Sequence, residues 1–290
     1  MMKDQLQRFL FEDFQIRGEI ANADSSFSEI TANHNYTEEV SNLMGELLIA
    51  TTLLTAMLKF EGKITVQLQG DGPVKMAVIN ANQNLVLRGT ASVDGDTKGL
   101  SFEQLVGKGH LMISIAPENG ERYQGIVALD HKSLSACLEN YFKQSEQLPT
   151  RIILHANSKD KMQCAGLLLQ TLPAKDADIE KHENNFQHVC ALAHTLKAQE
   201  IYDLEHDELL FRLYHQEEVR LFDEQAITYQ CSCSTERCLS SLASIQPEEI
   251  LEILKERGAI EMHCEYCATD YRFEINDLQV LLVDTHNQQH

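Results

Sequence analysis

The sequence has no hydrophobic run long enough to cross a lipid bilayer. Its longest apolar stretch, residues 47–58, has 12 residues and includes three threonines, whereas a transmembrane helix needs about 20 apolar residues. The first 14 residues contain acidic side chains and no apolar central segment, so they do not predict a secretory signal peptide. The lack of a transmembrane segment and of a signal peptide predicts a protein located in the cytosol, that is, cytoplasmic.

Positive charge is also scarce. Lysine and arginine together number 24 against 44 aspartates and glutamates, which gives a formal net charge of −20. A nucleic-acid surface needs clustered positive side chains, and attraction to an anionic lipid surface needs them too. The composition therefore argues against both nucleic acid and membranes as partners.

Several motifs of common enzyme classes are missing. No GxxxxGK[ST] loop for nucleotide phosphates occurs, and Gly107-x-Gly109 lacks the third glycine of a dinucleotide fingerprint. There is no GxSxG nucleophile elbow, and His182-Glu183 lacks the second histidine of the HExxH metalloprotease motif. We expect a protein that is not an enzyme and does not use ATP.

The 290 residues, 43% of them hydrophobic, are enough for a substantial core and suggest about two domains. Acidic charge is spread unevenly: the net charge is −4 over residues 1–175, −9 over 176–229 and −7 over 230–290. The composition changes near Pro173 and again before Cys231. We therefore predict a domain at 1–177, a helical linker at 178–229 and a small domain at 230–290.

The first domain is predicted to be α+β, because its strands form hairpins and its helices lie between groups of strands. One helix is expected to begin after Asn35 or Thr37 and to end at about Phe60. The remaining elements are expected at Ile64–Gln69, Val74–Ile79, Leu85–Leu87, Leu111–Ala116, Tyr123–Leu129, Arg151–Ala156 and Met162–Leu172 as strands, and at Ser133–Gln147 as a helix.

The linker is acidic and shows two narrow apolar stripes at helical spacing. Its stripe residues are Phe186, Val189, Ala193 and Leu196 in one helix, and Leu209, Leu210, Leu213 and Tyr214 in another. Two interpretations stay open. The segment is either a helical connector with solvated faces, or a marginally stable region that can unfold, because like charges repel and a narrow stripe buries little surface.

Five of the eight cysteines lie in the last 61 residues. Cys231-x-Cys233 and Cys264-x-x-Cys267 are separated by 30 residues, and two close pairs at such a distance are typical of a tetrahedral Zn²⁺ site. The metal would supply much of the folding energy of so small a domain. Further elements expected here are a strand at Ala226–Gln230, a helix from Pro247 to Gly258, strands at Ile260–His263 and Tyr271–Ile275, and a final helix from Asn276.

The remaining cysteines and His263 are not needed as ligands of the predicted zinc site. Cys238 and His263 are spare ligand candidates that the two pairs make unnecessary. Cys137 and Cys164 are expected to be small buried hydrophobic residues rather than reactive thiols, and the pattern leaves the role of Cys190 open.

The Cys-x-Cys half of the site is unusual for a structural zinc ribbon. Its oxidation would close a small, strained ring, and such disulfides are readily reduced. Zinc keeps its ligands as thiolates, the form that peroxide or hypochlorous acid attacks. The pattern therefore favours a metal site that can open upon oxidation.

Two other functions fit parts of the pattern. Cys264-Glu-Tyr-Cys267 could serve a thiol–disulfide oxidoreductase, but such motifs usually open a helix in a βαβ unit. A zinc ribbon could also bind RNA or a protein partner, although the net charge of this region argues against RNA.

Segments along nearly the whole chain resemble one bacterial family. Those that carry the resemblance are 231–238 (CSCSTERC), 263–267 (HCEYC), 68–73 (LQGDGP), 121–125 (ERYQG), 145–151 (SEQLPTR) and 210–215 (LFRLYH). By these segments the chain resembles the redox-regulated holdase chaperones of the 33-kilodalton heat-shock protein family.

The resemblance implies an inactive reduced form with one Zn²⁺ per chain held by Cys231, Cys233, Cys264 and Cys267. It implies that oxidation pairs Cys231 with Cys233 and Cys264 with Cys267, releases zinc, and unfolds the small domain and linker. The oxidised chain would form a homodimer, bind unfolding client proteins without ATP, and hand them over to ATP-dependent chaperones.

Overall fold

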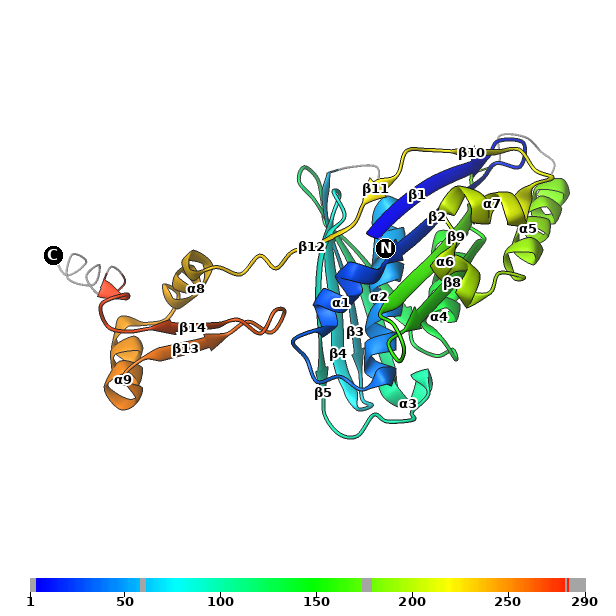
Figure 1. Cartoon of the computed structure of the whole chain (residues 1–290). Helices are drawn as coiled ribbons and strands as arrows, with labels where there is room; N and C mark the ends of the chain where they lie inside the picture. Colours follow the sequence, from blue (N-terminus) through cyan, green and yellow to red (C-terminus); the bar gives the residue numbers. More distant parts are fainter. Residues whose placement is uncertain (1–3, 58–60, 174–178, 280, 282–290) are drawn as a thin grey trace. The chain divides into compact units, whose positions relative to one another are not determined.

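The computed structural model describes residues 4–57, 61–173, 179–279 and 281. It divides into two compact units, Met1–Gln230 and Cys231–His290 (Figure 1). The linker predicted at 178–229 packs within the first unit. Among the described residues, no helix is both long and apolar enough to span a lipid bilayer.

The first unit contains two six-stranded sheets. The first sheet has the strand order β10-β1-β2-β9-β8, with β11 also paired to β1. Its strands are β1 (Asp4–Phe11), β2 (Ile16–Ala23), β8 (Thr150–Asn157), β9 (Gln163–Thr171), β10 (Val219–Leu221) and β11 (Gln225–Ala226). All of its pairings are antiparallel.

The second sheet has the order β12-β5-β4-β3-β6-β7. Its strands are β3 (Gly62–Gly70), β4 (Val74–Asn82), β5 (Val86–Val93), β6 (Gly109–Pro117), β7 (Tyr123–Ala128) and β12 (Thr228–Tyr229). Only the short β12 pairs in parallel, with β5; the other pairings are antiparallel. The α+β class predicted for this domain is confirmed.

Helix α2 (Glu38–Ala56) packs against both sheets and forms the centre of the main core (Figure 1). It begins where predicted, because the Thr37 hydroxyl accepts a hydrogen bond from the Val40 amide at 3.4 Å. It ends at Ala56 rather than near Phe60, and residues 58–60 lie outside the described part. Its buried threonines are satisfied by bonds to the carbonyl four residues earlier.

Strands β1 and β2 were not among the predicted elements. The sequence of β2 contains Gly18, Glu19 and Asn22, residue types that are depleted in strands, yet all three are buried. The predicted helix at Ser133–Gln147 is divided into α4 (Leu134–Tyr141) and a π-helical turn, η1 (Phe142–Glu146). The short helices α1 (Asp24–Thr31) and α3 (Phe102–Val106) complete the domain.

Three linker helices cover the face of the first sheet that α2 leaves free (Figure 1). They are α5 (Ile179–Ala193), α6 (Ala198–Asp203) and α7 (His206–Tyr214). Both predicted stripes are confirmed, since Val189, Ala193, Leu209, Leu210 and Tyr214 are buried there. The sheet supplies the other half of this second core through Phe9, Phe11, Ile16, Ile20, Ala165, Leu167 and Leu169.

A buried polar contact also fixes the linker to the sheet. The Asn22 side-chain amide of β2 donates to the Ile201 carbonyl of α6 at 2.8 Å. Its oxygen lies 2.8 Å from His206 Nε2 of α7. Because buried polar groups are costly without partners, this contact favours one docked arrangement of α6 and α7.

The strand predicted at Ala226–Gln230 is instead two short strands on different sheets. Gln225–Ala226 is β11 on β1, and Thr228–Tyr229 is β12 on β5. The buried side chain of Ile227 lies between them. The chain therefore passes from one sheet to the other within these five residues.

The second unit is small. It contains α8 (Thr235–Leu242), α9 (Pro247–Arg257) and a hairpin of β13 (Ile260–His263) and β14 (Asp270–Phe273). Helix α9 begins at Pro247 and is capped by Gly258 with φ 77°, as predicted. The buried apolar side chains of its core are Leu242, Ile250, Leu254, Ile260, Phe273 and Leu278. The final helix expected from Asn276 lies largely outside the described residues.

Candidate metal centre

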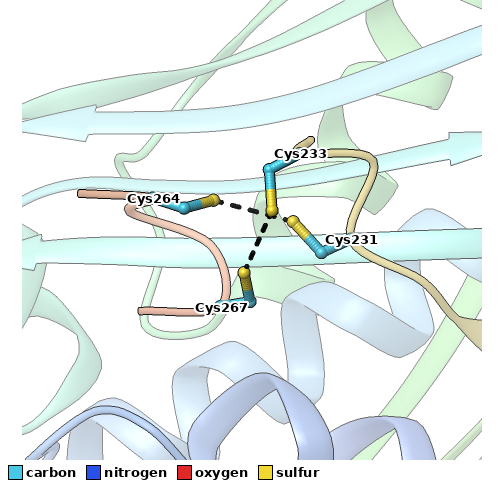
Figure 2. Close-up of side chains that lie close together, drawn as sticks. All are labelled: Cys231, Cys233, Cys264 and Cys267. Carbon is cyan, nitrogen blue, oxygen red and sulfur yellow. Dashed lines mark hydrogen bonds between the residues drawn. The ribbon is translucent and has the colours of Figure 1, made fainter. Parts of the chain in front are cut away.

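Four cysteines from two separate turns meet in the second unit (Figure 2). The Sγ atoms of Cys231, Cys233, Cys264 and Cys267 all lie within 4.8 Å of one another. Two sulfur–sulfur distances are 3.6 Å, for Cys231 and Cys264, and 3.4 Å, for Cys233 and Cys267. The structure thus gathers the four residues that the sequence predicts as ligands into one cluster that could hold a metal ion.

The first cysteine pair is held by the start of α8. The Ser234 hydroxyl accepts a hydrogen bond from the Arg237 amide at 3.3 Å and caps the helix. The Arg237 guanidinium reaches back and donates to the Ser232 carbonyl at 2.9 Å. The second of these bonds holds the backbone of Ser232, the residue between Cys231 and Cys233.

The second pair lies in the turn of the β13–β14 hairpin. The Cys264 amide donates to the Thr269 carbonyl at 3.0 Å, and the Ala268 amide donates to the Cys264 carbonyl at 2.8 Å. Ala268 has φ 55°, a left-handed conformation that non-glycine residues adopt at a cost. The turn brings the two thiols of Cys264 and Cys267 to the same side.

The spacing of the sulfurs fits a tetrathiolate metal site. Metal–sulfur bonds of about 2.3 Å in a tetrahedron place the sulfurs about 3.8 Å apart, close to the observed 3.6 and 3.4 Å. A disulfide would bring two sulfurs to about 2.05 Å, and all eight cysteines are free thiols. The geometry is therefore that of a reduced, metal-compatible cluster.

The acidities of two thiols in the cluster shift in opposite directions. Burial raises the pKa of Cys231 to about 12. The pKa of Cys267 falls to about 6: its burial acts in the opposite direction, but hydrogen bonds from Thr269 and from the thiols of Cys233 and Cys231 outweigh it. A divalent cation bound among the four sulfurs would favour the ionised form of each thiol.

Hydrogen bonds with neighbouring hydroxyl groups support two of the sulfurs. The Tyr271 hydroxyl of β14 donates to Cys233 Sγ at 3.1 Å, and the Thr269 hydroxyl lies 3.2 Å from Cys267 Sγ. Such outer hydrogen bonds orient metal ligands and tune their charge. Neither Tyr271 nor Thr269 was singled out in the sequence, because a tyrosine or threonine near a cysteine has no spacing signal of its own.

The other candidate ligands lie outside the cluster. Cys238 is half-buried in α8 and packs against the small core. The exposed His263 instead pairs its Nδ1 with Asp270 at 2.7 Å, and that hydrogen bond raises the pKa of His263. Among the described residues, neither belongs to the group whose ligand atoms converge on the site.

The three remaining cysteines are buried in the first unit, as expected for Cys137 and Cys164. Burial raises the pKa of all three thiols, in the case of Cys190 to about 11. Cys190 lies in α5 at the contact with the first sheet. Its thiol is therefore shielded only while the linker helices stay docked.

The oxidoreductase alternative does not fit the local structure. Cys264 and Cys267 lie in a hairpin turn between β13 and β14, not at the N-terminus of a helix, where the helix dipole would lower a thiol pKa. The net negative charge of this unit still argues against RNA.

Comparisons with known proteins agree with one another. The family model described as "Hsp33 protein" matches residues 4–274. A protein from Shewanella sediminis named "33 kDa chaperonin" is 51% identical over 98% of both chains. One of the same name from Pectobacterium atrosepticum is 46% identical over 98% of both chains.

The fold matches a solved structure as well. The crystal structure of a 33 kDa chaperonin, heat shock protein 33 homolog, from Thermotoga maritima superposes with a TM-score of 0.83. It covers 99% of this chain and 100% of its own at 20% identity, which supports the fold. With the family model matching nearly the whole sequence, this chain belongs to the Hsp33 protein family.

Proposed function

We propose that this protein is a redox-regulated, ATP-independent holdase of the cytoplasm. Reduced and metal-bound, it is inactive; oxidation of the cysteine cluster releases the metal and exposes surfaces that bind unfolding proteins. The observation that carries the proposal is the gathering of four sulfurs within 4.8 Å in a unit with only a small apolar core. The chaperone names of the curated relatives support the same class of function.

Zn²⁺ is the metal we propose, one per chain, with Cys231, Cys233, Cys264 and Cys267 as its ligands. Bound there, it would stabilise four thiolates and cross-link the two turns that carry them. The small core of this unit offers little compensation if that cross-link is lost. Folding of the second unit should therefore depend on the metal.

Oxidation would remove the ligands in pairs. We propose that Cys231 pairs with Cys233, and Cys264 with Cys267. Each pair of thiolates gives two electrons to an oxidant such as hypochlorous acid, forming one S–S bond while the oxidant becomes chloride and hydroxide. Two equivalents of oxidant convert all four thiolates, and no anionic sulfur then remains to hold a cation.

The consequence for the first unit follows from the way the linker is docked. Helices α5, α6 and α7 share one apolar core with the first sheet. When they leave, the buried faces of both the helices and the sheet become accessible to apolar segments of unfolding clients. The net charge of −20 would keep the opened chain soluble. We further propose a homodimer in the oxidised state and transfer of clients to ATP-dependent chaperones upon reduction.

Zinc release and client protection, measured together, test this proposal. Reduced protein is treated with hypochlorous acid and mild heat, zinc is followed with a chromophoric chelator, and light scattering of a heat-denatured client is recorded in the same sample. We expect both signals to change together. Retention of zinc, or its loss without client protection, would make the site structural only.

A matched pair of variants sharpens the test. Cys264→Ser removes one ligand and should lower zinc content and activate the protein without oxidant. Cys238→Ser removes a thiol outside the cluster and should leave both zinc content and switching unchanged. Equal behaviour of the two variants would contradict the assignment of the ligands.

A further inference from the structure

Residues 219–230, here called the strap, cover an edge of each sheet in the first unit (Figure 1). The Cα partners on β1 are Phe11 with Val219, Leu10 with Arg220, Phe9 with Leu221, Leu6 with Gln225 and Gln5 with Ala226. On β5 they are Val86 with Thr228 and Leu87 with Tyr229. In the described structure, β1 and β5 pair with no other strand on those sides.

The strap is held mainly by main-chain hydrogen bonds. The Phe222 amide donates to the Arg8 carbonyl at 2.9 Å, and the Ile227 amide donates to the Asp4 carbonyl at 3.0 Å. On the other sheet, the Thr228 amide donates to the Leu85 carbonyl, just before β5, at 3.0 Å, and the Gln230 amide donates to the Leu87 carbonyl of β5 at 2.9 Å. The strap thus satisfies edge groups along β1 and at the start of β5.

Side-chain burial adds little to this hold. Ile227 is the one buried side chain of the strap, and the side chains of β10 and β11 are largely exposed. The pairing on β5 spans only two residues and is parallel, the less stable geometry. Exposed hydrogen bonds with few apolar contacts mark a segment that opens at low cost.

The strap also connects directly to the cysteine cluster. Gln230, whose amide bonds to β5, is followed in the chain by Cys231, the first residue of the cluster. Loss of order at Cys231 would therefore begin next to the short pairing of the strap with β5.

Without the strap, β1 would stay in its sheet as a free edge. It pairs with β2 through all eight of its residues, so the strap is not needed to hold it. Neither β1 nor β5 contains proline, a residue that blocks edge pairing. An open, regular edge with unpaired N–H and C=O groups is a template for another extended chain.

We propose that the uncovered edge of β1 binds extended segments of unfolding client proteins by main-chain pairing. This inference deepens the proposed function and rests on it. Unfolding chains share unpaired backbone groups whatever their side chains, so edge pairing selects for lack of structure rather than for sequence. The apolar faces exposed beside the edge would add affinity for the client's side chains.

The orientation of β1 supplies an internal control for a hydrogen-exchange test of this proposal. Since Asp4 and Arg8 offer their carbonyls to the strap, the even-numbered residues of β1 turn their amides towards it. The amides of the odd-numbered residues Gln7 and Phe9 face β2. Residue-resolved hydrogen exchange of the full chain then separates the strap side from the β2 side.

We expect oxidation with mild heat to speed exchange at Leu6, Arg8 and Leu10 at least tenfold, and added unfolded client to slow it again at least tenfold. Gln7 and Phe9 should stay protected throughout. If client aggregation is suppressed while the strap-side amides remain fast, the edge is not the client site, although the chaperone function stands. If nothing is suppressed, the proposed function itself fails. Renewed protection at high protein concentration without client would mean that a second copy occupies the edge, which overturns the inference.

A cross-link tests the same point by function. Leu10 and Arg220 are paired across the strap and β1, and a hydrogen-bonded antiparallel pair has Cα atoms about 5.5 Å apart, within disulfide range. The double variant L10C/R220C should release zinc normally but protect clients at least twofold less than either single variant. Equal protection by locked and unlocked proteins would contradict a role for the β1 edge.

Discussion

Removing one buried contact of the linker should activate the chaperone without oxidant. Leu210 lies in α7 with 2% of its surface exposed and packs in the core between the linker helices and the first sheet. Its neighbour Phe211 is 70% exposed on the same helix. The substitution Leu210→Ala therefore weakens linker docking, whereas Phe211→Ala removes a side chain of similar size that contributes little to it.

The magnitude follows from the burial. Leucine-to-alanine substitutions in a core cost about 2–5 kcal/mol. Leu210 belongs to the linker core and not to the main core around α2, so the loss falls on docking of the linker. With tenfold for each 1.4 kcal/mol, the ratio of undocked to docked linker rises between about 30-fold and about 4,000-fold. Phe211→Ala should change it by less than about threefold, as for surface substitutions.

The assay uses reduced, zinc-bound protein and light scattering of a heat-denatured client. We expect L210A to suppress aggregation while its zinc content stays equal to that of the unmodified protein, and F211A to remain inactive. If proteolysis shows that the linker of L210A is open and the client still aggregates, linker release is not sufficient for activity. That result would refute the reasoning.

Three more predictions follow from the same structure. Chelation of zinc under reducing conditions should abolish hydrogen-exchange protection in α8 and α9 and leave β3 and β4 protected; protection in both units would contradict a metal-dependent fold. Cys190 should resist alkylation in the reduced protein and react after oxidant and heat, as read by mass spectrometry, while the fully buried Cys164 stays unlabelled. Burial raises the pKa of Glu19 from 4.5 to about 7, so the folded state binds that proton more tightly than the unfolded one. The stabilisation that protonated Glu19 gives to the folded state is fully present below pH 4.5. It is lost as pH rises towards 7, which lowers the free energy of unfolding by about 3 kcal/mol at most. Glu19→Gln should flatten this pH dependence of stability in denaturant titrations.

The cysteine cluster could be predicted from the sequence because its information is local. Each cysteine pair sits within one turn, and the spacing alone brings its two sulfurs to the same side. The linker stripes were predictable for a similar reason, since the period of apolar residues in α5 and α7 already identifies their buried faces. The docking partner of those faces carries no such signal.

Tertiary contacts stabilise the strands and helices that the sequence did not predict. Strand β2 buries Glu19 and Asn22, and the linker helices bond to Asn22; a strand with such residues becomes stable only when both of its faces are covered. The segment at 226–230 looks like one strand in sequence but divides between two sheets. Short helices such as α6 and α8 depend on caps and packing more than on periodicity.

We propose that loss of zinc at the cysteine cluster releases the linker from the first sheet. Its most direct test is hydrogen exchange of residues 179–230 in samples whose zinc content is measured during oxidation. We expect protection of α5, α6, α7 and the strap to decline in step with zinc, while β3 and β4 stay protected. A protein that has lost its zinc and holds client while the linker helices keep their protection would contradict it.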